Sequence, residues 1–197
     1  MQKYQRKTMK KNPALTGFII SVFFVIMAFG VYFLFLSKKD YYLVDNPTPD
    51  IYYFRINDDA ERIITAGQYI KVDLPKGTNR IKVYDEKKSM IYDSAFTVNK
   101  VRGLLNISHQ DYYINTQYYG YDLKRDSLLS ALGTTMIDGK AYHGAPKHFN
   151  SLYTEDFYYN LDERYDPVIK NIQKVEARTK IFRKQDFLNY YKDYYQF

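Results

Sequence analysis

The chain has 197 residues and a formal net charge of +7, with no cysteine, no tryptophan and 23 tyrosines. The absence of cysteine excludes a disulfide-stapled domain and a lipoprotein anchored through an acylated cysteine. About 150 residues can bury a single core without disulfides, so an exported domain of this composition fits a bacterial cell envelope better than a eukaryotic cell surface.

The first predicted element is a helix that spans a membrane. Residues 14–36 contain no charged side chain, and only Thr16 and Ser21 interrupt the apolar run. A helix needs roughly 20 apolar residues to cross the hydrocarbon layer. A cleaved signal peptide has a shorter apolar core, and the small residues Ala28 and Gly30 lie inside this one. We therefore expect an anchor that is retained.

The charges on the two flanks predict the orientation of this helix. Residues 1–13 carry five basic side chains and no acid, whereas the other flank carries two lysines followed at once by Asp40. The positive-inside rule places residues 1–13 in the cytoplasm and residues 37–197 outside it, in the periplasm. The side chains expected at the membrane interface, in contact with lipid, are Lys10, Lys11, Lys38, Lys39, Tyr41 and Tyr42.

The basic tail also explains the net charge. It accounts for +5 of the +7, so residues 37–197 carry only +2. A protein that follows a phosphate backbone concentrates basic side chains on its folded domain. The charge distribution therefore argues against a nucleic-acid partner.

Residues 37–49 read as a juxtamembrane linker that ends in the stiff spacer Pro47-Thr48-Pro49. From residue 50 the pattern changes to short alternating segments separated by turns, which predicts an antiparallel β-sandwich over residues 50–119. The expected strands are 51–56, 61–65, 68–74, 79–85, 90–98, 104–109 and 111–119. The fold class is therefore mainly β.

Residues 120–197 predict a mixed extension packed on the sandwich. A short helix is expected at 126–133, and Asp138-Gly139 is a type I′ turn signal that predicts a hairpin over 134–143. Alternation predicts a half-buried strand at 174–182. The apolar spacing of Phe187, Leu188 and Tyr191 predicts a terminal helix over 184–197.

The segment GQYIKVDLPKGTNRIKVYD (67–85) resembles the small β-sandwich modules of the PEGA-like kind. The shared pattern is a strand, a Leu-Pro-x-Gly turn and a second strand that ends with a valine and an aromatic residue. Thr65-Ala66-Gly67 stands where those modules carry the Pro-Glu-Gly-Ala tetrad. The resemblance, which covers residues 50–98, implies an exported binding or spacing unit without catalysis, and it implies no site residues.

Candidate chemistry is sparse. His143 and His148 are five residues apart in a loop, but zinc requires three or four ligands and no third donor is indicated. The sequence has no nucleophile elbow, phosphate-binding loop or dinucleotide fingerprint. We therefore expect no enzyme, no metal and no cofactor.

The tyrosines supply the remaining hypothesis. In a strand, one member of a Tyr-Tyr pair faces the core and the other faces outward, where tyrosine favours contact with proteins. The sequence thus predicts a non-catalytic scaffold subunit that docks multi-span or periplasmic envelope proteins, or a second copy of itself. The alternative is a module that binds peptidoglycan or capsule. The candidate docking residues are Tyr112, Tyr113, Tyr118, Tyr119, Tyr190, Tyr191, Tyr194 and Tyr195.

Overall fold

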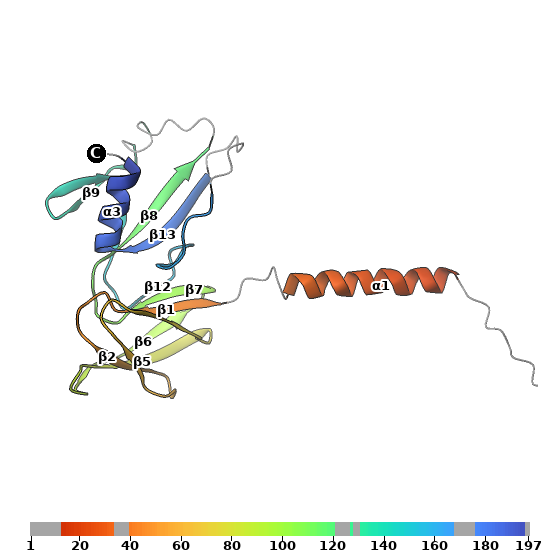
Figure 1. Cartoon of the computed structure of the whole chain (residues 1–197), viewed down its shortest axis with the longest axis horizontal. Coiled ribbons are helices and arrows are strands. Elements are labelled where there is room, and N and C mark those ends of the chain that lie inside the picture. The colour runs from red at the N-terminus through yellow and green to blue at the C-terminus, as the bar shows by residue number, and fades with distance from the viewer. Residues whose placement is uncertain (1–12, 34–39, 121–126, 128–130, 168–175, 196–197) are drawn as a thin grey trace, which may run out of the picture. The chain divides into compact units, whose positions relative to one another are not determined.

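The computed structural model describes residues 13–33, 40–120, 127, 131–167 and 176–195. The chain divides into two compact units between Lys39 and Asp40. The first unit contains helix α1 (Pro13–Val31), and the second contains the described strands and helix α3 (Lys184–Tyr195) (Figure 1). The fold is mainly β, with one apolar helix near the N-terminus and one helix after the last strand, as the pattern predicts.

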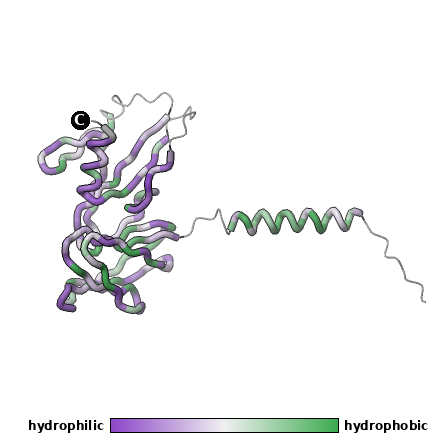
Figure 2. Tube along the Cα trace, in the orientation of Figure 1, coloured by the Kyte–Doolittle hydropathy of each residue, from purple (hydrophilic) through white to green (hydrophobic). Residues whose placement is uncertain are grey.

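Helix α1 is apolar throughout, and Figure 2 shows this as a nearly continuous hydrophobic tube. Pro13 occupies the first helical position, where its missing N–H costs no hydrogen bond. The hydroxyl of Ser21 donates to the carbonyl of Gly17 at 3.1 Å, so this polar group is satisfied within the helix. By length and composition α1 can span a membrane.

The described part of the second unit contains three sheets and a separate hairpin. Sheet A has the order β12 (Tyr153–Thr154), β7 (Arg102–Asn106), β1 (Tyr41–Asp45) and β4 (Tyr69–Val72). Sheet B has the order β3 (Arg62–Ile64), β2 (Tyr52–Ile56), β5 (Gly77–Tyr84) and β6 (Met90–Val98). Sheet C has the order β11 (Lys147–Phe149), β8 (Tyr112–Tyr119) and β13 (Glu176–Arg183). The hairpin pairs β9 (Thr134–Ile137) with β10 (Lys140–His143).

These elements pack in layers with sheet A between two others. One core cluster joins sheet B to one face of sheet A, with Phe54, Ile81 and Val44 among its buried members. A second cluster joins the other face of sheet A to sheet C through Leu43 and Leu104. A third cluster covers the outer face of sheet C with α3 and the hairpin.

Sheet B follows the alternation of its sequence closely. Ile81 and Val83 of β5 are fully buried, and their neighbours Arg80 and Lys82 lie on the opposite face. Strand β6 begins and ends where the sequence predicts, at Met90 and Val98. One face of this sheet covers apolar side chains and the other meets water, which is the condition that produces a clear alternation.

The links between strands differ from those predicted. Within residues 40–120, only the β2–β3 and β5–β6 connections join strands that are adjacent in one sheet. Strand β4 pairs with β1 in sheet A, so the turn Pro75–Gly77 carries the chain from sheet A to sheet B, with Gly77 at a φ of 93°. Strands β1 and β7 pair in parallel, so the arrangement is rich in antiparallel pairs but is not purely antiparallel.

The expected linker over 37–49 is wrong for residues 41–45, which form β1 at the centre of the domain. Tyr42, Leu43 and Val44 are consecutive and almost fully buried. Consecutive burial arises because sheet A is covered on both faces, and such strands show a continuous apolar run instead of alternation. The run over residues 42–44 is short and lacks the alternation of apolar and polar residues by which a strand is predicted.

The expected boundary between residues 119 and 120 is also wrong. Strand β8 belongs to sheet C, where all eight of its residues pair with β13 from the far end of the chain. Strand β12, from the supposed extension, completes the edge of sheet A beside β7. The C-terminal residues therefore supply strands to the domain, and residues 40–197 form one compact unit.

The hairpin over 134–143 and the helix over 184–195 are confirmed. Asp138 and Gly139 both have positive φ, at 49° and 77°, as a type I′ turn requires. The stretch after His143 is only partly a loop, because residues 147–149 form β11. Of the helix expected over 126–133, residues 127, 131 and 132 are helical, while residues 126 and 128–130 lie outside those described.

Candidate docking groove

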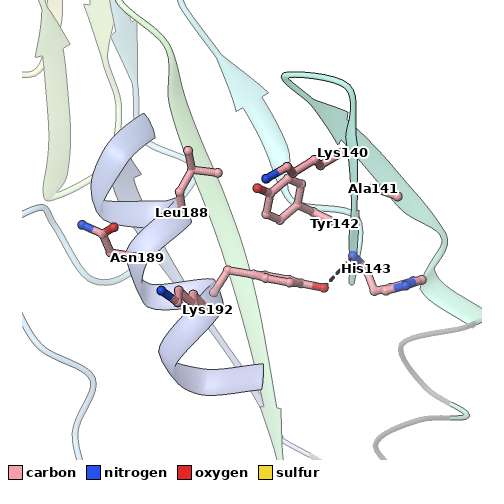
Figure 3. Close-up of a pocket in the computed structure, with 8 residues that line it drawn as sticks. Lys140, Ala141, Tyr142, His143, Leu188, Asn189 and Lys192 are labelled. Carbon is pink, nitrogen blue, oxygen red and sulfur yellow. Dashed lines mark hydrogen bonds between the residues drawn. The ribbon is translucent and has the colours of Figure 1, made fainter. Parts of the chain in front are cut away.

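A groove of about 680 Å³ runs between the β9–β10 hairpin and α3. Figure 3 shows Lys140 and Tyr142 on the hairpin side and Leu188 and Lys192 on the helix side. The residues that line it are Lys140, Ala141, Tyr142 and His143 of β10, and Leu188, Asn189, Tyr191 and Lys192 of α3. The groove thus joins two segments separated by more than forty residues in the sequence.

The floor of the groove is aromatic and rests on a packed core. Tyr142 and Tyr191 meet edge to face with ring centroids 4.9 Å apart. Both contact Phe187, which is fully buried and stacks on Tyr113 of β8 at 5.2 Å. Each such aromatic pair adds to the burial energy, so this floor is a fixed surface.

Two polar contacts hold the walls together at separate points. The backbone N–H of His143 donates to the hydroxyl of Tyr191 at 2.9 Å, the contact drawn as a dashed line in Figure 3. The ammonium of Lys184, at the start of α3, lies 2.7 Å from a carboxylate oxygen of Asp138 in the hairpin turn. The hairpin and helix are therefore tied at both the turn and the open end of the hairpin.

The rim of the groove is basic. Lys140, His143 and Lys192 are all exposed, and none of the described residues that line the groove carries a carboxylate. Within the described part of the chain, neither Lys140 nor Lys192 lies in an ion pair. An aromatic floor with two ammonium groups at its edge suits a ligand that presents acidic groups beside apolar ones.

A second, smaller cavity of about 460 Å³ lies on the other side of α3 and has a mixed lining. It contains the carboxylates of Asp162, Glu163 and Asp186 beside Lys180, which is 7% exposed. Alternation predicts a half-buried strand in this region, but both faces of sheet C are covered, so Lys180 of β13 is buried.

The ammonium of Lys180 organises the loop that crosses this cavity. It donates to the carbonyl of Asn160 at 2.6 Å, of Leu161 at 3.0 Å, and of Glu163. Burial lowers the pKa of Lys180 to about 8, and the neighbouring acids offset part of that shift. Because its donors all serve main-chain carbonyls, this lysine fixes the loop and is not a nucleophile open to a ligand.

A buried ion pair links sheets A and C. Asp45 of β1 is fully buried and accepts from Arg183 Nε at 3.0 Å, Arg183 Nη2 at 2.5 Å and the Tyr112 hydroxyl at 2.5 Å. Burial raises the pKa of Asp45, and the Arg183 fork opposes that rise. The network joins residues 45, 112 and 183, so it fixes how the C-terminal strands meet the N-terminal ones.

The residues expected at the membrane interface divide into two groups. Lys10, Lys11, Lys38 and Lys39 lie outside the described residues. The interfacial role assigned to Tyr42 is wrong, because this side chain is fully buried in the domain, whereas Tyr41 is half-buried at the start of β1 and its interfacial role stays a prediction.

Their partners are as follows. The Tyr41 hydroxyl donates to Asp162, and its ring lies 4.3 Å from Lys71 Nζ. The Tyr42 hydroxyl donates to the carbonyl of Lys100 at 2.8 Å and is itself fully buried. Burial in the domain raises the pKa of both phenols.

The candidate docking tyrosines are also divided by the structure. Tyr112 and Tyr113 are buried and unavailable to a partner, because sheet C is covered on both faces and both members of the pair find a core. Tyr118, Tyr119 and Tyr190 are half-buried. The backbone of Tyr194 and Tyr195 is helical, and their side chains lie outside the described part.

Among the candidate tyrosines whose side chains the structure describes, Tyr191 alone lines the groove, and the sequence did not identify Lys140, Tyr142 or Lys192 as its neighbours. The hairpin and the apolar face of the helix were each predictable from local pattern. Their contact was not, because no local signal specifies which face of sheet C they share. The sequence indicated only that the hairpin and the helix each carry an exposed basic residue, Lys140 and Lys192.

The two histidines considered as metal ligands have different surroundings. His148 of β11 lies 2.7 Å from Asp111 and contacts the ring of Tyr113, whereas His143 lies at the groove. Among the residues that the structure describes, no group of three or more His, Asp or Glu side chains is placed to hold a metal ion.

Comparison with known proteins supplies no relative for this chain. No protein-family model, no curated protein and no solved structure matched it. The features of this chain that bear on function are therefore the geometry of the groove and the apolar helix α1.

Proposed function

We propose that this protein is a single-pass protein of a bacterial inner membrane, with residues 1–13 in the cytoplasm and residues 40–197 in the periplasm. Helix α1 supports the anchor, since it is long and apolar enough to span the bilayer. The five basic residues before it, against two after it, support the orientation. The absence of cysteine is consistent with an exported bacterial domain that folds on its core alone.

Topology reporters test this part directly. An alkaline phosphatase fused after Phe197 should be active. A green fluorescent protein fused at the same position and exported by the general secretion pathway should not fluoresce. The chain should also remain in the membrane pellet after washing with alkaline carbonate. A fluorescent reporter at Phe197, or release by carbonate, would overturn the proposed topology.

Within that location we propose a non-catalytic accessory role, in which the domain docks another envelope protein. The observation that supports this proposal is the groove between the hairpin and α3, which has an aromatic floor. At its rim, Lys140 and Lys192 form no ion pair with any described residue. Aromatic side chains at the centre of a patch supply most interface energy, and peripheral charges set specificity. The PEGA-like pattern of residues 67–85 is compatible with a binding unit.

The expected ligand is a segment of a partner protein that carries acidic residues beside apolar ones. A glycan is the alternative, favoured by the tyrosines of the floor. Sugars stack on an open ring face, however, and Tyr191 is only 6% exposed while Tyr142 meets it edge to face. This geometry presents little open ring surface, so it favours a peptide segment over a sugar ring.

The test is affinity purification of the full chain from native membranes in mild detergent, followed by mass spectrometry. We expect a defined partner that is lost from the double variant Lys140→Gln/Lys192→Gln, with binding weakened about tenfold as two rim charges are removed. The matched control is Lys87→Gln/Lys147→Gln, which removes two exposed lysines outside the groove and should retain the partner.

Retention of the same partner by both double variants would remove the groove from the proposal. A parallel pull-down on purified peptidoglycan should leave the wild-type chain in the supernatant. Retention on peptidoglycan that requires Lys140 and Lys192 would instead support the glycan alternative.

A further inference from the structure

Strand β6 is an uncovered edge of sheet B. It has nine residues, Met90–Val98, and pairs with β5 on one side only, with a register shift at Ile91 near its first end. In residues 40–120, 131–167 and 176–195, no main-chain hydrogen bond reaches its other side. Backbone groups along such an edge are available to pair with another strand.

The other described sheet edges are short or covered, so β6 differs from them. The edges β3, β4, β11 and β12 have two to four residues each. Strand β13 is long, but the main chain of Tyr159 covers part of it, donating to the Thr179 carbonyl at 3.0 Å and accepting from the Ile181 N–H at 3.2 Å. Shortening and covering are the usual ways in which proteins prevent edge pairing.

The composition of β6 adds no other protection. It contains no proline, glycine or lysine, and its single charge, Asp93, is already held by Arg80 through contacts of 2.5 and 2.9 Å. Met90 and Ile91 at its first end are 59% and 49% exposed. An exposed strand of this length with apolar residues at its end is a surface that association would bury.

We propose that β6 pairs with β6 of a second copy of this chain, antiparallel and centred on Ser94. In this register Ser94 lies opposite its own copy, Tyr92 lies opposite Phe96, and Asp93 lies opposite Ala95. No like charges face each other, the aromatic residues meet, and Met90 lies opposite Val98. A two-fold axis at Ser94 joins the two four-stranded B sheets into one continuous sheet.

The absence of cysteine from the chain gives a clean test of this register. At the axis the two Cα atoms of residue 94 lie about 4.5–5.5 Å apart, within the range of about 4.4–6.8 Å that a disulfide spans. We expect S94C, in the full chain in mild detergent, to form a disulfide-linked dimer on mild oxidation. The matched control I91C places its sulfurs about 20 Å apart and should stay uncrosslinked.

A charge pair at position 95 tests the same contact by affinity. Ala95 is exposed and lies opposite Arg80 within the monomer and opposite Asp93 of the second copy in the dimer. A95E should therefore weaken dimerisation about tenfold, because it places like charges together twice by symmetry, whereas A95K should not weaken it. Within the monomer, Arg80 gives the two variants the opposite order of stability, so the folding effect and the dimer effect are distinguishable.

Light scattering on the full chain in detergent, corrected for bound detergent, reads out both variants. Three results would each overturn the proposal. The wild type could be monomeric at micromolar concentration, S94C and I91C could cross-link equally, or A95E and A95K could dimerise equally. A strand of an unrelated protein on β6 would leave S94C monomeric when purified alone, and that result also counts against a second copy. The groove variants at Lys140 and Lys192 should dimerise normally.

Discussion

Sheets B and C are stabilised in different ways. Sheet B takes its four strands from residues 52–98, with β4 of that stretch lying in sheet A, and its buried face is apolar except for Asn79. Sheet C joins β8 to β13, which are separated by more than fifty residues, and it buries Asn115, Gln117 and Lys180 along with its apolar residues. Local pattern is enough to define the first sheet, whereas the second needs specific polar contacts to fix which distant segments pair.

The largest expected effect comes from the buried ion pair behind sheet C. Arg183→Met removes the fork that neutralises Asp45 and leaves a fully buried carboxylate with only the Tyr112 hydroxyl. Breaking a buried pair in this way typically costs about 3–5 kcal/mol. Urea titration of the full chain in detergent at pH 7 should show this loss in the free energy of unfolding.

Sheet B offers a matched control with the same chemistry. Arg80 holds Asp93 through two contacts of 2.5 and 2.9 Å, but this pair is on the exposed face of the sheet. Water screens such a pair, so Arg80→Met should leave the unfolding midpoint nearly unchanged. Equal losses from the two arginine variants would contradict the distinction between the two sheets.

A second difference between the sheets concerns pH. Burial lowers the pKa of Lys180 in sheet C to about 8, whereas an unfolded lysine titrates near 10.4. Between these values the unfolded chain binds one more proton than the folded chain, so the contribution of this group to stability rises with pH. From pH 8 to pH 10, the rise amounts to about 1 kcal/mol per pH unit.

Lys180→Met isolates this contribution. The stability of the wild type relative to the variant should increase between pH 8 and pH 10, whatever the absolute cost of the substitution. A constant wild-type difference for Lys180→Met would show that the folded lysine titrates normally.

The same contrast explains how far sequence reasoning reached. The strands of sheet B, the 134–143 hairpin and the terminal helix were predictable, because alternation, the Asp138-Gly139 turn and helical spacing are local signals. Strand β1 was not, because burial on both faces removes the alternation. Tyr112 and Tyr113 were assigned to a docking surface for the same reason, since the pattern cannot show that both faces of β8 are covered.

The groove was predictable only in its parts. Tyr191 could be placed on the apolar face of the terminal helix, and Lys140 could be placed next to the hairpin turn. Their proximity depends on Phe187 packing against Tyr113 of sheet C, a contact between residues more than seventy positions apart. A docking site formed by two such elements is visible only after their packing is known.

The smallest expected effects come from two tyrosine hydroxyls, one in each half of the domain. Tyr92 of sheet B donates to the carbonyl of Ile107 at 2.8 Å, and burial raises the pKa of this phenol. Tyr92→Phe leaves that carbonyl without its donor and should cost about 1 kcal/mol. The hydroxyl of Tyr191 instead accepts from the N–H of His143, an exposed residue that water can reach.

Tyr191→Phe should therefore cost less stability than Tyr92→Phe, roughly 0.5 kcal/mol or below, because water replaces the lost partner. Its effect should appear in docking instead, since it frees one tie between the walls while keeping the aromatic floor. Urea titrations rank the two stabilities, and partner retention on the affinity resin measures docking. If Tyr191→Phe destabilised the fold more than Tyr92→Phe, the tie would be a core contact and the groove walls would be part of the main core.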